Sequence, residues 1–325
     1  MTIRWGYALN QWDTNIDDFV RPRDHERAFK TISISGFTGV ELTAVSFGAW
    51  EPFGSPLALA NAYGSIPEFR DLLREWRIDA ISSWFYDPAV GFEQEMGRGP
   101  DLFQPGAAEK VAETAAWFAE ALAGLGGSVL VVRPVGSAWQ VGALDDDRIG
   151  TLARLWEHVA RAIAPHGIRL ALHVDFLSAL RLEDGLERLL AASDPDLVTL
   201  AIDTGELAIA GIDPVDLYRR HAARVSHVHL SDARERVDLE EALVPHADHV
   251  VRIAGGDREV GRWIFEPGDH RGLVDSVAFT QALVDGGFDG WVVVETDKSP
   301  HHAESTMISG WQVQKVLQPL TGEKA

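Results

Sequence analysis

The segment VSHVHLSDAR, residues 225–234, places two histidines inside an otherwise apolar and β-branched run. Successive side chains of a strand point to opposite faces, so His227 and His229 share one face while Val228 and Leu230 share the other. The apolar face suits packing against a shell of helices, and the histidine face then points away from that shell. This pattern is typical of a buried parallel strand that carries polar side chains towards its carboxyl end.

A strand followed by a helix recurs along the whole chain, with no low-complexity segment or Ser/Gly linker between units. Short apolar runs mark the strands, and longer stretches with helical periodicity mark the helices. The predicted strands are 4–9, 39–44, 78–84, 128–134, 169–175, 198–204, 225–232 and 291–297. The predicted helices are 24–35, 66–77, 107–125, 146–166, 182–192, 214–221, 273–285 and 304–316. Eight such units predict a (β/α)8 TIM barrel, formed by residues 1–325 as a single domain.

Three predicted connections are longer than the others, at residues 45–64, 85–104 and 233–272. They follow strands 2, 3 and 7, which places them at the end of the barrel where active sites occur. Loops longer than about 12–15 residues usually have a functional reason or are disordered. We therefore expect long loops around the site, and the sequence leaves open whether residues 235–262 close the site or meet another subunit.

The composition excludes several classes of function. The 325 residues include no cysteine, which excludes disulfides, thiolate metal sites and cysteine nucleophiles and fits a reducing compartment. The formal net charge is −20, which argues against nucleic-acid binding because clustered lysines and arginines are scarce. No apolar run approaches the ~18 residues of a membrane span, and the N-terminus does not resemble a secretory signal. We expect a cytoplasmic protein that binds neither nucleic acid nor a membrane.

Polar side chains end each of the last four predicted strands, and in a barrel these strand ends converge. The residues are His173 and Asp175 on strand 5, Asp203 and Glu206 on strand 6, His227 and His229 on strand 7, and Glu295 on strand 8. Imidazoles mixed with carboxylates suit manganese, iron, cobalt or zinc. Each histidine could instead be a hydrogen-bonded barrel residue, and a carboxylate could cap the next helix. Burying Asp203, His229 and Glu295 without a metal would require a separate compensation for each charge.

Five segments of the chain resemble the sugar phosphate isomerase/epimerase superfamily of xylose isomerase-like TIM barrels. They are VELTA (40–44), LALHVDF (170–176), AIDTGELAIAG (201–211), VSHVHLSDAR (225–234) and DGWVVVETD (289–297). They occur in the family's order over almost the whole chain. Within the superfamily, the sequence is similar to inosose dehydratases and to the large subunits of C-glycoside deglycosidases. The motifs specify the substrate poorly, because the superfamily includes epimerases, isomerases, dehydratases and an endonuclease.

The resemblance implies one divalent metal ion, bound by one residue from each of strands 5 to 8. Asp203, His229 and Glu295 fall on the family's ligands, and His173 stands where many members have glutamate and dehydratase-like members have histidine. We expect manganese first, with cobalt, iron, zinc or magnesium as alternatives. Two motifs differ from those of the family. The family's DTGH is DTGE in this chain, which introduces Glu206, and the family's HLKD is HLSD.

Members of this superfamily generally remove a proton next to a carbonyl, and the resemblance implies the same chemistry here. The metal stabilises the resulting enediolate, and a nearby base moves the proton. Glu295 is the expected base as well as a ligand, Asp175 and Glu206 are the candidate second acid/base pair, and His227 is a further catalytic candidate. Loss of a β-substituent then gives a lyase on a keto-sugar or keto-polyol. Return of the proton to another face or carbon gives an epimerase or isomerase.

Candidate substrate-binding residues are two arginines and several aromatic residues at strand ends. Arg133 follows strand 4 and Arg234 follows strand 7, where each could clamp a hydroxyl or an anion or form a surface salt bridge. The aromatic residues include Trp12, Trp84, Phe85 and Trp139. Most aromatic residues serve packing, but some could stack on a sugar ring or an aromatic aglycone. Stacking would suit a C-glycoside deglycosidase, which cleaves a 3-keto C-glycoside at an aromatic carbon and works with a small second subunit.

Functions of different classes therefore remain open. The leading hypothesis is a metal-dependent lyase, either inosose dehydratase-like or the large subunit of a C-glycoside deglycosidase. An epimerase or isomerase on the same metal site is the nearest competitor, and a non-catalytic sugar-binding barrel subunit is the third hypothesis. A DNA endonuclease is disfavoured by the net charge of −20. We expect an oligomer, with a small second subunit as an open alternative.

Overall fold

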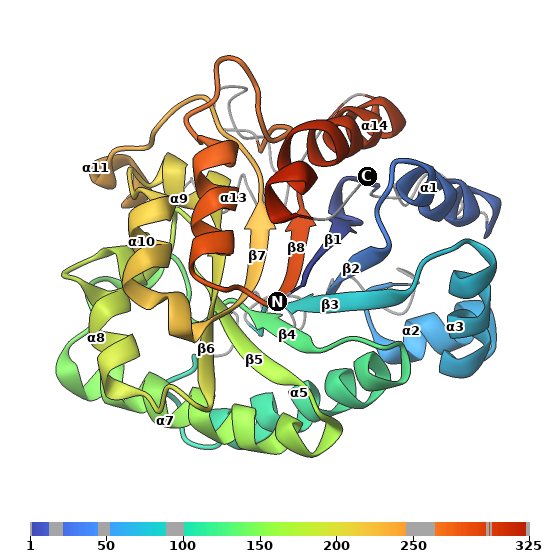
Figure 1. The fold of residues 1–325 in the computed structure, drawn as a ribbon. Coiled ribbons are helices and arrows are strands. Elements are labelled where there is room, and N and C mark those ends of the chain that lie inside the picture. The colour runs from blue at the N-terminus through green and yellow to red at the C-terminus, as the bar shows by residue number, and fades with distance from the viewer. Residues whose placement is uncertain are drawn as a thin grey trace.

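The computed structural model describes residues 2–12, 22–44, 53–88, 101–244, 264–296, 299 and 301–322. Within them, eight parallel strands form a closed barrel in chain order (Figure 1). The strands are β1 (Ile3–Ala8), β2 (Gly39–Ala44), β3 (Ala80–Tyr86), β4 (Val129–Val132), β5 (Arg169–His173), β6 (Val198–Asp203), β7 (Val225–Leu230) and β8 (Gly290–Val294). The barrel closes where β8 pairs with β1, from Ile3 opposite Gly290 to Tyr7 opposite Val294. The predicted TIM barrel is confirmed.

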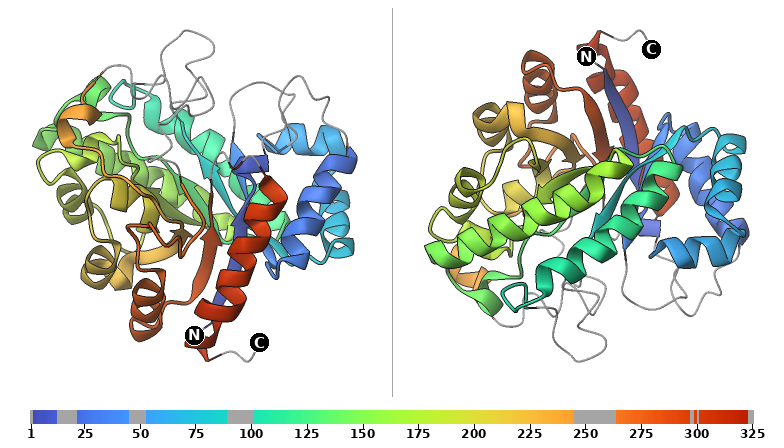
Figure 2. Two further views of the ribbon diagram at one scale, coloured as in Figure 1. Left: turned by 90° about the horizontal axis from the view of Figure 1, so that it is seen from above. Right: turned by 90° about the horizontal axis from the view of Figure 1, so that it is seen from below.

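Helices surround the barrel on the outside. They are α1 (Pro22–Ile34), α2 (Pro56–Tyr63), α3 (Ile66–Glu75), α5 (Ala107–Gly124), α6 (Ala138–Val141), α7 (Asp146–Ile163), α8 (Gly185–Ala192), α9 (Thr204–Ile209), α10 (Pro214–His221), α11 (Leu239–Ala242), α13 (Ser276–Asp285) and α14 (His302–Gln312). The long helices α5 and α7 lie side by side (Figure 2). Asp213 caps α10 by accepting the N–H groups of Val215 and Asp216, and a proline begins the helix as predicted. No helix among the described residues is long and apolar enough to cross a membrane.

The structure differs from the sequence-based expectations at several connections, and the segment predicted as a loop after β7 contains the short helix α11. The sequence predicts a loop over residues 45–64, but this segment contains α2, which Ser55 caps by accepting the N–H of Ala58. The sequence also predicts a helix from Leu273, whereas α13 begins at Ser276, after its cap Asp275. Parts of all three predicted long loops, at 45–52, 89–100 and 245–263, lie outside the described residues.

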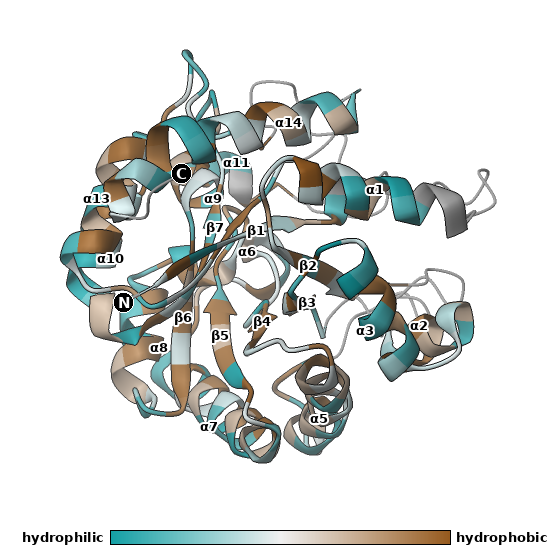
Figure 3. Cartoon of the chain, turned by 45° about the vertical axis from the view of Figure 1, so that its right-hand side comes forward, coloured by the Kyte–Doolittle hydropathy of each residue, from teal (hydrophilic) through white to brown (hydrophobic). Residues whose placement is uncertain are grey.

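The main apolar core lies between the strands and the helices. Figure 3 shows largely hydrophobic strands, with hydrophilic and hydrophobic stretches alternating along the surrounding helices. Inside the barrel, a separate buried cluster includes Val131, Ala171 and Ala201. Because alternate residues of a strand face the same side, His173 and Asp203, two positions further along β5 and β6, also face the barrel interior. Small apolar residues of β4, β5 and β6 thus line part of the barrel interior beneath the predicted site.

Asp232 joins the start of the connection after β7 to its end. Its Oδ1 accepts hydrogen bonds from the N–H of Ala233 at 2.8 Å and the N–H of Val274 at 2.9 Å. Burial raises the pKa of Asp232 to about 6. The Asp232 carboxyl group therefore binds its proton more tightly in the folded protein than in the unfolded chain. Its contribution to the stability of the fold is fully present below about pH 4 and is lost as the pH rises through about 6.

Replacing Asp232 by asparagine should alter the pH dependence of stability. The amide keeps an oxygen acceptor for both N–H groups but carries no charge at any pH. Relative to the wild type, the free energy of unfolding of Asp232→Asn is expected to rise by on the order of 1 kcal/mol between about pH 4 and about pH 7.5. Urea denaturation at both pH values measures this difference, and parallel pH profiles of the two proteins would show that the Asp232 carboxyl does not act in this way.

Candidate metal centre

A cavity of about 330 Å³ opens at the carboxyl ends of the barrel strands. Inward-facing residues alternate along each strand, so Thr43 follows Glu41 on the wall, and Asp87 follows Phe85. The described residues that line the cavity are Asn10, Glu41, Thr43, Phe85, Asp87, Arg133, His173, Asp175, Phe176, Leu177, Asp203, Glu206, His229 and Glu295. Residues from widely separated parts of the sequence therefore meet at one end of the barrel.

The four predicted metal ligands meet at this cavity. Asp203 Oδ2 lies 3.1 Å from His173 Nε2 and 3.5 Å from His229 Nδ1. Glu295 Oε2 lies 3.1 Å from the same Nδ1 of His229. The side chains of His173, Asp203 and His229 are buried, and that of Glu295 is 21% exposed. The arrangement offers two nitrogen and two oxygen donors from β5, β6, β7 and the end of β8.

The hydrogen bonds around these groups leave one oxygen of each carboxylate directed at the histidines. Asp203 Oδ1 accepts a hydrogen bond from Ser231 Oγ at 3.1 Å, and Glu295 Oε1 accepts one from Asn10 Nδ2 at 2.6 Å. The Nδ1 atom of His229 is buried, and it meets hydrogen-bond geometry with none of the described residues. A buried nitrogen next to two carboxylate oxygens fits a divalent ion of the manganese-to-zinc series.

The charges of the site are strongly coupled to one another. Burial lowers the pKa of His229, but the carboxylates of Glu41 and Glu295 outweigh burial and raise the pKa well above its ordinary value. Burial also lowers the pKa of His173, and the hydrogen bond with Asp203 raises it overall. Burial raises the pKa of Asp203, but the hydrogen bond with His173 and the charges of His173 and His229 lower it overall. A metal ion that binds here replaces protons on the histidines, so binding releases protons.

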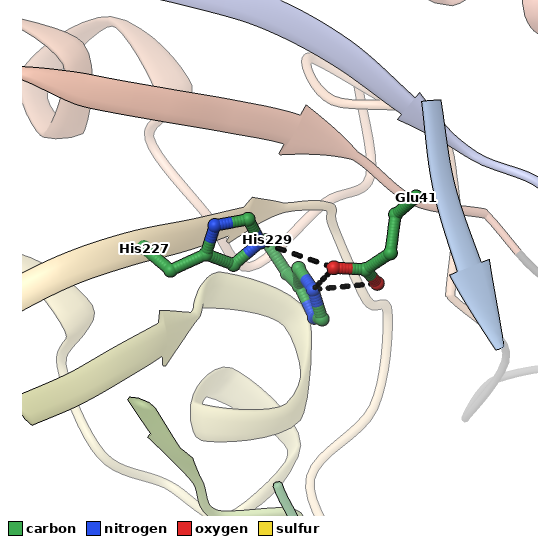
Figure 4. A group of neighbouring side chains, drawn as sticks. All are labelled: Glu41, His227 and His229. Carbon is green, nitrogen blue, oxygen red and sulfur yellow. Dashed lines mark hydrogen bonds and ion pairs between the residues drawn. The ribbon is translucent and has the colours of Figure 1, made fainter. Parts of the chain in front are cut away.

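Glu41 is a site residue that the sequence analysis does not identify. It lies on β2, and its Oε2 accepts a hydrogen bond from Ser83 Oγ at 2.6 Å. The same oxygen lies 3.1 Å from His227 Nε2 and 3.0 Å from His229 Nε2 (Figure 4). The signal that could have found it is a charged residue within the apolar run GVELTA, residues 39–44.

His227 lies behind this group rather than on the cavity wall. It precedes His229 by two positions on β7, which places it deeper in the barrel, where its side chain is fully buried. Burial lowers the pKa of His227, and its Nε2 faces Glu41. Direct contact between His227 and a substrate, as its predicted catalytic role would need, is not compatible with this position.

The two predicted arginines have different surroundings. Arg133 lines the cavity, where its Nε donates to Asp175 Oδ2 at 2.5 Å and its Nη1 lies 3.5 Å from Asp87 Oδ2. Burial raises the pKa of Asp175, but Arg133 outweighs burial and lowers the pKa overall. Arg234 pairs with Asp269 at 2.5 Å and is absent from the described part of the cavity wall.

The predicted tryptophans do not line the described part of the cavity. Trp84 points outward because Phe85, the next residue, points inward, and its indole is fully buried against α5. Trp12 and Trp139 are half-buried at other positions near the barrel mouth. The aromatic residues that do line the described cavity are Phe85 and Phe176.

Comparisons with known proteins agree with this architecture. The inosose dehydratase of Lacticaseibacillus casei is 31% identical over 191 residues, which are 55% of this chain and 60% of that protein. The chain thus matches about 60% of the length of this curated relative. The probable 3-DHS dehydratase of Bacillus anthracis superposes with a TM-score of 0.66 at 14% identity, over 96% of this chain and 99% of the other. The 3-keto-D-glucoside 4-epimerase of E. coli superposes with a TM-score of 0.59 at 16% identity, over 95% of this chain and 97% of the other.

Superpositions at 14% and 16% sequence identity establish the fold alone. The family is shown by the sequence itself. The family model described as a xylose isomerase-like TIM barrel matches residues 29–313. This range includes β2 to β8 and therefore every strand that supplies one of the four predicted ligands. The chain belongs to the family of xylose isomerase-like TIM barrels.

Proposed function

We propose that the chain is a divalent-metal-dependent lyase that acts through an enediolate on an uncharged keto-sugar or keto-polyol. The observation that carries this proposal is the meeting of His173, Asp203, His229 and Glu295 on one cavity, with further carboxylates beside them. The relatives named as inosose dehydratases support an enzyme that acts on a small sugar-like substrate. Manganese is the first metal to test.

The charge of the cavity supports an uncharged substrate. The acidic residues among those that line it are Glu41, Asp87, Asp175, Asp203, Glu206 and Glu295. Arg133 is the arginine on the described wall, and it already pairs with two of these acids. A phosphate or carboxylate on the substrate would meet an excess of negative charge in a buried setting, even with a divalent ion present. Hydroxyl and carbonyl groups would meet hydrogen-bond acceptors and donors instead.

The side chains can be assigned roles in such a reaction. A bound divalent ion would supply a Lewis acid for the negative charge that develops on substrate oxygens. Glu295 is the most exposed of the four ligands, and Asn10 holds its other oxygen, so it is suited to accept the proton next to the carbonyl. Asp175, kept ionised by Arg133, is suited to accept a hydrogen bond from a substrate hydroxyl. Glu206 is suited to protonate the departing β-hydroxyl, so that one C–H and one C–O bond break and water leaves.

Two other reactions on the same site have observations in their favour. Epimerisation or isomerisation is the second candidate, because Glu206 and Glu295 line one cavity from different elements and either could return a proton. Cleavage of a 3-keto C-glycoside is the third, because Phe85 and Phe176 offer an aromatic surface to an aglycone. Oligomerisation, a small second subunit and a cytoplasmic location stay predictions of the sequence.

Incubation of the manganese-loaded protein with a keto-inositol in heavy water tests this proposal. We expect the product to have lost one water and to carry solvent deuterium on the carbon that lost its hydroxyl group, as measured by NMR and mass spectrometry. A chelator should abolish both changes. The anionic 3-dehydroshikimate should react at least about 100-fold more slowly, because its carboxylate meets the acidic wall.

The outcomes separate the candidate reactions. Exchange without loss of water would favour the epimerase or isomerase. Release of the aglycone from a 3-keto C-glycoside, with no reaction of keto-inositols, would favour carbon–carbon cleavage. No exchange on keto-inositols, 3-keto-glucosides or 3-keto C-glycosides with any of manganese, cobalt, iron, zinc and magnesium would contradict the proposed function.

A further inference from the structure

Glu41, Ser83 and His227 form a hydrogen-bonded cluster directly behind His229. We propose that Glu41 is a positioning residue, whose carboxylate accepts the Nε2–H of His229 and so presents the Nδ1 of that ring to the cavity as the ligand atom. This inference rests on the proposed metal site, and it gives a role to a residue outside the set of four ligands.

The two ring nitrogens of His229 face different partners. Nε2 lies 2.9 Å from Glu41 Oε1 and 3.0 Å from Glu41 Oε2, whereas Nδ1 lies 3.1 Å from Glu295 Oε2 at the cavity. An ionised carboxylate can only accept hydrogen bonds, so each of these nitrogens carries a proton in the metal-free protein. A metal ion bound by Asp203 and Glu295 would replace the proton on Nδ1, while Glu41 keeps the proton on Nε2. A proton fixed on Nε2 leaves Nδ1 as the atom that can offer a lone pair to a metal ion.

Glu41 reaches His229 across the interior of the barrel, because β1 and β8 separate β2 from β7 in the sheet (Figure 4). Its side chain is 2% exposed, and a buried carboxylate is costly unless its oxygens are satisfied. Ser83 Oγ donates to it at 2.6 Å, and His227 Nε2 lies within hydrogen-bond distance at 3.1 Å. These two donors hold the carboxylate in place, which gives the buried His227 a supporting role in orienting His229.

The spacing of the cluster favours hydrogen bonds over a second metal ion. Ligand atoms around a tetrahedral ion with bonds of about 2.0–2.1 Å are separated by about 3.3 Å. Glu41 Oε2 is much closer than this to Ser83 Oγ, at 2.6 Å, so this oxygen is already engaged in a short hydrogen bond. His227 is also closed off from the cavity, so an ion would have no path to it along the described wall.

The variant Glu41→Gln tests the proposal. Glutamine keeps the size of the side chain, but it removes the charge and replaces one acceptor oxygen with a donor. Loss of the partner of a metal-binding histidine typically weakens metal affinity by about 10–100-fold. We expect a loss of this size in Mn(II) affinity, measured by isothermal titration calorimetry on protein shown to be folded by circular dichroism. The matched control is Asp175→Asn, which removes a carboxylate from the same cavity wall. Asp175 pairs with Arg133 and not with a metal-binding histidine, so this variant should lose less than about tenfold in Mn(II) affinity.

A second measurement needs no metal. NMR of the metal-free wild type labelled with 15N-histidine should show a downfield, exchange-protected Nε2–H resonance of His229, assigned by its absence in His229→Asn. In Glu41→Gln, this resonance should disappear or move upfield. If the wild type lacks this resonance, the proposal is overturned even when the variant does not fold. The proposal is also overturned if folded Glu41→Gln shows an unchanged resonance or an unchanged Mn(II) affinity. If the wild type binds no divalent ion while the resonance responds to Glu41→Gln, the proposed function fails and the hydrogen bond of Glu41 is supported.

Discussion

Replacing Asp203 by asparagine is expected to reduce the affinity for a divalent ion by at least about 100-fold and to abolish turnover, while the fold is kept. The reason is that the two oxygens of Asp203 have separate tasks. Oδ1 caps α9 by accepting the N–H of Glu206 at 3.0 Å, and Oδ2 faces His173 and His229. Asparagine is as good a helix cap as aspartate, but its amide nitrogen would direct a donor at the metal position. The expected loss exceeds the range for partners outside the ligand set.

The matched control for this variant is Asp213→Asn. Asp213 caps α10 in the same way, through the N–H groups of Val215 and Asp216, and it is not on the described cavity wall. Calorimetric titration with Mn(II) should give wild-type affinity for the control and no measurable binding for Asp203→Asn. Wild-type affinity in a folded Asp203→Asn protein would remove Asp203 from the ligand set.

Replacing Arg133 by methionine is expected to lower the free energy of unfolding by about 3 kcal/mol and to reduce kcat/KM by about 100-fold or more. Arg133 is the cation between Asp175 and Asp87, and all three side chains are largely buried. Methionine fills a similar volume but leaves two carboxylates without their partner in a low-dielectric setting. The loss of activity follows because Asp175 then no longer keeps a fixed orientation at the cavity.

A second substitution separates the lost charge from lost packing. Adding Asp175→Asn to Arg133→Met removes one of the uncompensated charges, so the double variant should regain on the order of 1 kcal/mol. Arg161→Met is the exposed control, because Arg161 pairs with Glu157 on the surface of α7 at 3.1 Å, and it should cost less than about 0.5 kcal/mol. Urea denaturation measures all three proteins. Equal costs for Arg133→Met and Arg161→Met would show that the buried ion pairs do not hold the cavity wall.

The fold can be predicted from the sequence because each βα unit carries its own local signals. The helix α10 is predicted with its observed bounds, since Asp213-Pro214 marks its start. The helix α2 is missed because its sequence, PLALANAY, is apolar on most sides and lacks the polar face of a surface helix. The cap and proline at Ser55-Pro56 were the available signal.

The site can be predicted along the strands but not across the barrel. The ligand candidates come from strand ends, whose convergence follows from the fold. The contact between Glu41 and His229 joins residues far apart in sequence, so no local pattern reveals it. The orientation of Trp84 depends on the phase of β3, which pairs with β2 through a register shift between Val40 and Glu41. A shift of one residue exchanges the inner and outer faces, which local propensity cannot decide.

The central claim is that one divalent ion is bound by His173, Asp203, His229 and Glu295, and metal content tests it most directly. Elemental analysis should be made on the wild type and on the double variant His229→Ala, Glu295→Gln, each after incubation with Mn(II) and removal of free metal. We expect about one ion of manganese, iron, cobalt or zinc per wild-type chain and none in the folded double variant. A wild type that retains no metal, or a double variant that retains as much as the wild type, would contradict the account.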